Sequence, residues 1–157
     1  MRRATVLAVV MVLALGGTVQ AAPRVPMVTG AYAYQYGAGT STVLLAARGG
    51  DPARGSLAFA GPFGSFRGPV TCVTVIGSDA WVAGEITVGA PEIEGVVYHG
   101  WAVRVHDGGT PGRKGDTAIT LIDPPEVSLE YCQSADSSVD DWQVPVTGGN
   151  LVVQPAR

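Results

Sequence analysis

Residues 95–121, GVVYHGWAVRVHDGGTPGRKGDTAITL, decide the fold of this chain. Side chains alternate along residues 97–106, with apolar residues at most odd positions and mixed ones at even positions. This period of two predicts a strand with one apolar face. We therefore expect His99 and Trp101 to point into the core, and Arg104 and His106 to point outward. Glycine and proline break the strand at residues 107–115, and residues 116–121 resume it, so the stretch predicts a hairpin.

The first 21 residues have the pattern of a secretory signal peptide. Arg2 and Arg3 give a basic start, residues 4–15 are almost entirely apolar, and Val19-Gln20-Ala21 is a small-residue cleavage site. The apolar run is shorter than the ~20 residues that a spanning helix needs, which disfavours an uncleaved anchor. We expect cleavage after Ala21, a secreted extracellular protein, and no membrane insertion after cleavage. Cleavage after Ala22 is the less favoured alternative, because Pro23 would then come first.

The remaining chain, residues 22–157, has the size of a single domain with one core. Two of the ten basic residues lie in the signal segment, which leaves eight against 13 acidic residues and a net charge of −5. Lys114 is the single lysine. An acidic chain without a basic cluster repels phosphate backbones, so nucleic acid is excluded as a partner. The excess of arginine over lysine, with abundant Gly, Ala and Val, suits a bacterial GC-rich genome.

Cys72 and Cys132 are the two cysteines of the chain. An even number of cysteines in an exported protein favours a disulfide, and we predict one between them. Two separate buried thiols are the alternative. A zinc site is poorly supported, because two cysteines and two distant histidines lack the usual ligand spacing.

Short apolar runs separated by glycine and proline fill the rest of the chain, and we find no sustained helical periodicity. We read residues 127–132 as a short strand and residues 133–143 as a long polar surface loop. The sequence predicts an all-β fold, a single antiparallel β-sandwich or flattened barrel of about nine short strands. The expected strands cover residues 28–36, 41–48, 56–60, 70–76, 80–88, 97–106, 116–123, 127–132 and 150–154.

Two groups of aromatic residues invite a binding interpretation. Tyr32, Tyr34 and Tyr36 share one face of a strand and could form a platform for sugar rings. Packing against neighbouring strands is the more ordinary role for such a row, and we favour it. Phe63 and Phe66 lie in a Gly- and Pro-rich loop, where they either plug one end of the core or form an exposed recognition tip.

Three runs, VTCVTVIGSDAWVAGEIT, VRVHDGGTPGRKGDTAITL and GGNLVV, resemble the secreted bacterial post-COAP-type domains. The resemblance covers about residues 70–153 and implies an export-destined β-sandwich with no established activity. Residues 130–141 and Cys132 depart from the family pattern, so the resemblance lends no support to the disulfide. The matching positions are Cys72, Gly77, Ala80, Gly84, Val105, Asp107, Pro111, Gly112 and Asp116.

No catalytic or cofactor signature is present, and we assign no catalytic residue and no cofactor. His99 and His106 are an odd number of residues apart, so they face opposite sides of one strand and cannot form a metal pair. Glu92 and Glu94 lie two apart on a loop, whereas acid–base work on sugars needs carboxylates opposed across a bond. The chain also lacks a Gly-x-Ser-x-Gly elbow and a phosphate-binding glycine loop.

Asp107 and Asp116 lie at the two ends of the central loop and are weak candidates for a metal site. Two close carboxylates repel each other, so either a Ca²⁺ ion or internal groups must offset them. Two carboxylates beside two cations, Arg113 and Lys114, fall short of a Ca²⁺ ligand set. We therefore predict that loop amides and these cations offset the carboxylates, and that the protein does not bind Ca²⁺ at micromolar concentration.

Two classes of function remain. We favour an exported non-catalytic domain, with a binding or structural role at the cell exterior and an unknown surface, glycan or protein partner. The alternative is a small secreted hydrolase acting on an extracellular polymer, with acidic groups that come together only in the fold. An aspartate close to a histidine, with a shifted pKa, would favour the hydrolase.

Overall fold

The structure, a computed structural model, describes residues 24–109 and 114–156 and consists mainly of β-strands. The predicted signal peptide and the loop residues Pro111, Gly112 and Arg113 lie outside the described residues. Ten strands are present in the described chain, with one α-helix, α1 (Pro125–Ser134), and one 3₁₀ turn, η1 (Asp140–Trp142). The strands are β1 (Met27–Tyr36), β2 (Gly39–Arg48), β3 (Arg54–Gly61), β4 (Gly64–Ile76), β5 (Asp79–Glu85), β6 (Glu92–Ile93), β7 (Val96–Val97), β8 (Gly100–His106), β9 (Thr117–Asp123) and β10 (Val144–Gln154).

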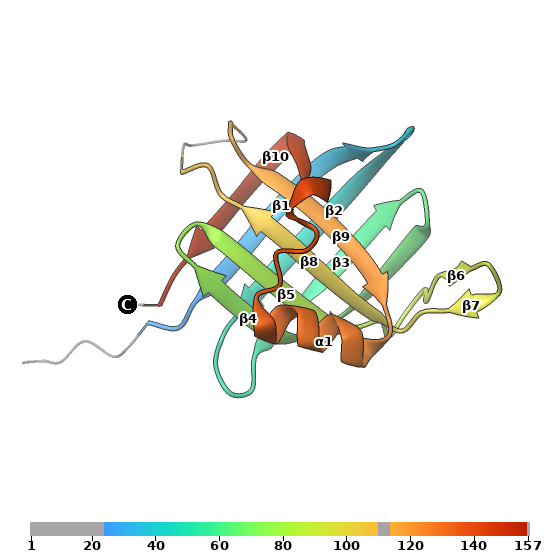
Figure 1. Cartoon of the computed structure of the whole chain (residues 1–157), viewed down its shortest axis with the longest axis horizontal. Helices are drawn as coiled ribbons and strands as arrows, with labels where there is room; N and C mark the ends of the chain where they lie inside the picture. The colour runs from blue at the N-terminus through green and yellow to red at the C-terminus, as the bar shows by residue number, and fades with distance from the viewer. Residues whose placement is uncertain (1–23, 110–113, 157) are drawn as a thin grey trace, which may run out of the picture.

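Eight of the strands close into an antiparallel barrel, and β6 and β7 form a separate hairpin (Figure 1). Each barrel strand pairs with its neighbour in chain order, and β1 pairs with β10 to close the ring. The all-β prediction is confirmed, and of the two architectures considered the barrel is the one observed. Closure removes the exposed edges that an open sheet would leave.

Alternation along the strands places the core inside the barrel. In β2, Ser41, Val43, Leu45 and Ala47 are buried while the residues between them are exposed. In β8, Trp101, Val103 and Val105 belong to this same core and are fully buried. The period-two pattern that predicted a strand therefore also identified its inward face.

The prediction of a long continuous central strand was wrong at its beginning. The chain breaks at Tyr98 and His99, between β7 and β8, and the backbone amide of Tyr98 donates to Pro91 O across the base of the hairpin. His99 is consequently exposed instead of lying in the core. Arg104 does point away from the barrel interior, as expected, but it is only 5% exposed because α1 and η1 cover that face.

The predicted strand at residues 127–132 was also wrong, because these residues form most of α1. Pro125 occupies the first turn of the helix, where its missing amide costs nothing, and Glu126 suits the positive end of the helix dipole. Ser128, Tyr131 and Cys132 are the buried residues and follow helical spacing. Ala135, in the left-handed conformation with φ of 51°, ends the helix. The segment of residues 133–143, predicted as a loop, therefore contains the end of α1 and all of η1.

A second, smaller core lies between α1 and the outside of the barrel. Trp81, Ala83, Ala102 and Ile119 contribute their side chains from the strands. The disulfide Cys72–Cys132, with a Cα–Cα distance of 6.2 Å, joins β4 to the helix within this core. The predicted disulfide is thus confirmed, and it fixes α1 against the barrel wall. Within the described ranges, no helix is long and apolar enough to cross a membrane.

Candidate ligand pocket at the barrel mouth

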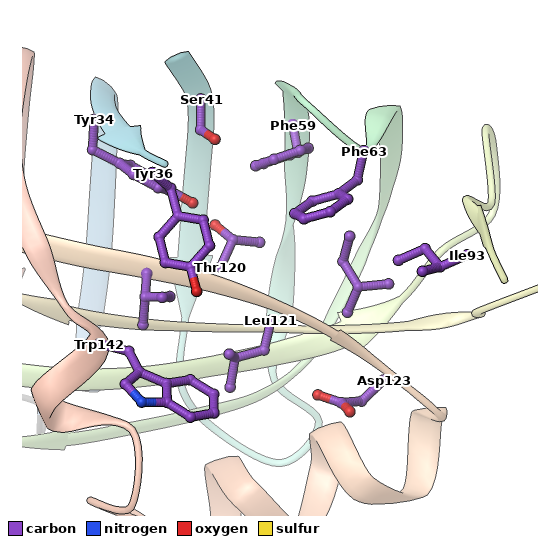
Figure 2. A pocket seen from close by; sticks show the side chains of 12 residues that line it. Tyr34, Tyr36, Ser41, Phe59, Phe63, Ile93, Thr120, Leu121, Asp123 and Trp142 are labelled. Atoms are coloured by element: carbon purple, nitrogen blue, oxygen red, sulfur yellow. The ribbon is translucent and has the colours of Figure 1, made fainter. Parts of the chain in front are cut away.

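A pocket of about 270 Å³ opens at one end of the barrel (Figure 2). The beginning of β1 and the end of β10 lie at the opposite end (Figure 1). The turns β1–β2 and β3–β4 and the β6–β7 hairpin lie at the end with the pocket, which we call the mouth. The pocket is lined by Tyr34, Tyr36, Ser41, Phe59, Phe63, Ile93, Ile119, Thr120, Leu121, Ile122, Asp123 and Trp142.

The pocket exists because the barrel is only loosely closed beside β9. Strands β10 and β9 pair through only two residue pairs of the described chain, Val144↔Ala118 and Pro145↔Thr117. Beyond Ala118, β9 continues to Asp123 while the chain before β10 turns away into η1. Residues 119–123 consequently line the pocket without interruption. A fully paired β10 would cover this edge.

Three half-exposed aromatic side chains surround the opening. Tyr36 is 42% exposed at the end of β1, Phe63 is 48% exposed in the β3–β4 turn, and Trp142 is 55% exposed at the end of η1. Figure 2 shows their rings around one space from separate parts of the chain. Large exposed apolar groups that gather around a concavity are typical of binding surfaces.

The structure shows which of the predicted aromatic residues pack in the core and which are exposed at the mouth. Tyr32 and Tyr34 pack inside the barrel, with ring centroids 6.4 Å apart, so the packing prediction is right for two of the three tyrosines. Tyr36, the third, lines the mouth pocket. Phe66 stacks on Phe59 in the core, with centroids 4.8 Å apart. Phe63, in contrast, is the exposed tip.

Four hydroxyl groups, on Tyr34, Tyr36, Ser41 and Thr120, contribute to the polar part of the pocket wall. Burial raises the pKa of Tyr34, and the proximity of Thr120 and Ser41 partly offsets this. Tyr34 therefore keeps its proton at neutral pH. These hydroxyls can donate to or accept from a ligand without adding charge.

Asp123 is the one carboxylate among the described residues that line the pocket. It is the last residue of β9 and half-buried, and burial raises its pKa above the usual value for an aspartate. Within the described ranges, no protein group donates a hydrogen bond to its carboxylate. Figure 2 shows the carboxylate on the same side of the β9 ribbon as Leu121, with Phe63 on the other side. A partly desolvated anion without a donor is an energetic cost that a bound donor or cation can offset.

A second cavity of about 440 Å³ adjoins the first between α1 and the β9 edge. We call it the acidic groove. Leu121, Asp123 and Trp142 line both cavities. The other residues of the acidic groove are Val127, Glu130, Tyr131, Ser134, Asp136, Ser138 and Val139.

A charged network attaches η1 to the barrel wall. The buried Arg104 donates through Nη1 to Asp79 Oδ1 at 2.9 Å and through Nε to Asp140 Oδ1 at 3.0 Å. Its guanidinium carbon lies 4.0 Å from the centroid of the Trp81 ring. The Trp81 indole in turn donates to Asp136 O at 2.7 Å. These contacts fix the segment after α1 and so set the position of Trp142.

The same network contains the aspartate–histidine pair that would favour a hydrolase. His106 Nδ1 lies 2.8 Å from Asp79 Oδ1. Burial raises the pKa of Asp79, but the hydrogen bonds from Arg104 and His106 outweigh that effect and lower it. Among the described residues, no hydroxyl or thiol is hydrogen-bonded to His106, and the pair lines neither the mouth pocket nor the acidic groove. The geometry is that of a structural hydrogen bond between two side chains.

The other candidate residues do not come together. Glu92 and Glu94 are exposed on the β6–β7 hairpin. Asp107 accepts the amides of Gly109 at 2.8 Å and Val153 at 2.9 Å, and Asp116 accepts the amide of Gly108 at 3.0 Å. Backbone amides therefore bond both carboxylates, although Asp116 Oδ2 has no partner among the described residues. The part predicted for Arg113 lies outside the described residues. Within residues 24–109 and 114–156, no group of three or more His, Cys, Asp or Glu is arranged to hold a metal ion.

Comparison of the chain with protein-family models, curated proteins and solved structures found no match. The function must therefore be argued from the site itself.

Sequence reasoning had named Tyr36 and Phe63 but missed Asp123 and the acidic groove. Asp123 precedes two prolines, a signal for the end of a strand and not for a site. Trp142 follows Asp140 and Asp141, and a tryptophan in a polar segment was the only local sign of an exposed aromatic.

Proposed function

We propose that this protein is an exported binding domain that holds a small molecule with an apolar ring in the mouth pocket. The observation that carries the proposal is the convergence of Tyr36, Phe63 and Trp142 around one opening at an incompletely paired barrel edge. Eight-stranded barrels have an interior that side chains fill or that holds one small ligand. Here the interior is filled, and the free space lies at the mouth.

The pocket size limits the ligand. A dry cavity of about 150 Å³ accommodates benzene, so this pocket suits about one ring with a short chain. A ligand of roughly a dozen heavy atoms, at about 0.4 kcal/mol each, would bind with a dissociation constant near 0.1–1 mM. The natural ligand would bind more tightly if it also uses the hydroxyls or Asp123.

The three tryptophans provide the test. We would titrate 4-phenylbutan-1-ol into the ¹⁵N-labelled protein and follow the three indole N–H resonances. The Trp142 resonance should shift with saturation, because this indole lines the pocket. The Trp81 and Trp101 indoles donate to Asp136 O and Glu85 O, so they act as internal controls that should barely move.

Variants then locate the site. Tyr36→Ala and Phe63→Ala should each weaken binding about 3- to 10-fold, because each removes one wall of the pocket. Leu44→Ala is the matched control, since Leu44 is equally exposed on the outer face of β2 and lines no part of the pocket. An unmoved Trp142 resonance, or an equal effect of Leu44→Ala, would refute the proposal.

A secreted hydrolase is the second candidate, and the Asp79–His106 pair is the observation in its favour. Arg104 occupies the same carboxylate, and the described residues provide no nucleophile or second acid next to His106. The binding function therefore has the stronger structural support. The resemblance to the post-COAP-type domains agrees with an exported, non-catalytic role and stays a prediction.

A further inference from the structure

We propose that the ligand of the mouth pocket is an amphiphilic amine, whose ring lies among Tyr36, Phe63 and Trp142 and whose ammonium group lies against Asp123. This inference rests on the proposed function and adds the chemical class of the ligand. It depends on the position of one carboxylate at the junction of an apolar pocket and an acidic groove.

The charge of the walls is of one sign. Neither the mouth pocket nor the acidic groove is lined by a lysine or arginine among the described residues. Asp123 lines both, and the groove adds Glu130 and Asp136. Arg104, the buried basic residue of the described chain, is already paired with Asp79 and Asp140. These carboxylates would repel an anionic ligand and attract a cation.

The Asp123 carboxylate has no hydrogen-bond donor among the described residues, and a ligand could provide one. This carboxylate is half-buried and accepts no hydrogen bond from the residues described. A primary ammonium group provides three donors and a full positive charge. It would therefore satisfy the carboxylate in the way that a neutral hydroxyl cannot.

The aromatic rim fits the same ligand. Tyrosine and tryptophan rings attract an ammonium group over their faces, and such cages are used to recognise methylated and free amines. Tyr36 and Trp142 line the same pocket as Asp123, and Figure 2 shows the Asp123 carboxylate on the same side of the β9 ribbon as Trp142. The aromatic rim thus offers apolar surface to the ring of the ligand and electron-rich ring faces to its ammonium group.

The acidic groove contains an additional unsatisfied group. Tyr131, which lines it, is 8% exposed, and its hydroxyl has no hydrogen-bond partner within the described part of the chain. A buried hydroxyl that lacks a partner is uncommon and points to a missing polar neighbour. An amine with a second polar group beyond the ammonium could reach from Asp123 into this groove.

The test compares three probes that share a phenyl ring and a four-carbon chain: 4-phenylbutylamine, 4-phenylbutan-1-ol and 4-phenylbutanoate. Binding is measured at pH 7 and low ionic strength from the Trp142 indole resonance. We expect the amine to bind at least 10-fold more tightly than the alcohol, and the carboxylate more weakly than the alcohol. In Asp123→Asn the amine should lose most of this advantage, with the alcohol unchanged within about 2-fold.

Asp51→Asn is the matched control, because it removes the same charge from an exposed turn at the opposite end of the barrel. It should leave the preference for the amine intact. Equal binding of amine and alcohol to the wild-type protein would refute the amine proposal but leave the proposed function standing. Failure of all three probes to move the Trp142 resonance would refute both. An equal loss in Asp51→Asn would show that net charge, and not the site, causes the preference.

Discussion

Replacing Arg104 with methionine should destabilise the protein and loosen the wall of the ligand pocket. Methionine keeps most of the buried apolar stem but removes the guanidinium group. The change eliminates the hydrogen bonds to Asp79 and Asp140 and the contact with the Trp81 ring. The substitution therefore tests the polar contacts and not the packing volume.

The expected loss follows from the exposure of the two partners. Breaking a fully buried ion pair costs about 3–5 kcal/mol, because an unpaired charge stays in the interior. Here the Asp79 and Asp140 side chains are 33% and 40% exposed, so water can solvate both once Arg104 is gone. We expect a loss of about 2–3 kcal/mol in the free energy of unfolding, since charged hydrogen bonds contribute about 1.5–3 kcal/mol each and rehydration offsets part of this.

Urea unfolding of the two proteins measures this loss, and an unchanged m-value shows that the folded and unfolded states stay comparable. Arg67→Met is the matched control, because Arg67 is exposed on β4, and it should change stability by less than about 0.5 kcal/mol. A double-mutant cycle with Asp140→Asn should give a coupling of about 1–2 kcal/mol. The folded variant should also bind 4-phenylbutan-1-ol more weakly, because Asp140 begins the turn that ends at Trp142.

Some buried ion pairs can be replaced by apolar residues with no loss or even a gain in stability. If Arg104→Met were as stable as the wild type, the network would not stabilise the fold. If it were less stable but bound the alcohol equally well, Arg104 would not determine the position of Trp142.

Two further predictions concern stability. Removing the disulfide with Cys72→Ala and Cys132→Ala together should lower the free energy of unfolding by about 4 kcal/mol in the entropic model, because the cysteines are 60 residues apart. Urea unfolding measures this loss, and a loss below about 1 kcal/mol would contradict the prediction. The pKa of Asp79 is lowered in the folded state, so its contacts stabilise the protein fully above about pH 4, the usual unfolded value, and the benefit is lost as pH falls through the lower folded pKa. Unfolding free energies of the wild type and Asp79→Asn should therefore converge between about pH 4 and pH 2, and a constant difference over that range would count against the ion pair.

Local patterns predicted what depends on near neighbours in the sequence. The alternation of residues 101–105 gave the strand β8 and its buried face, because the side-chain direction in a strand is a local property. Glycine and proline runs placed most of the turns. The disulfide was predicted because the protein is expected to be exported, and not from geometry. The structure places Cys132 on a helix instead of the expected strand.

Other features depended on contacts that no local pattern contains. The α1 segment has only ten residues, and its buried face includes a serine and a cysteine, so its hydrophobic periodicity is weak. It is a helix because the outer face of the barrel and the disulfide hold it in place, and short helices owe most of their stability to such packing. Burial of Arg104 has the same origin, since α1 begins 21 positions after it and Asp140 lies 36 positions away.

Closure of the barrel decided the site. Pairing of β1 with β10 joins residues such as Val28 and Val153, and nothing near either residue specifies the other. The short register between β10 and β9 then leaves residues 119–123 uncovered and brings Tyr36, Phe63 and Trp142 to one opening. The sequence alone therefore determined most of the barrel strands, most turns and the presence of the aromatic groups. Only the tertiary structure decided that they meet, because chain closure and strand register are set by long-range packing and not by local side-chain periodicity.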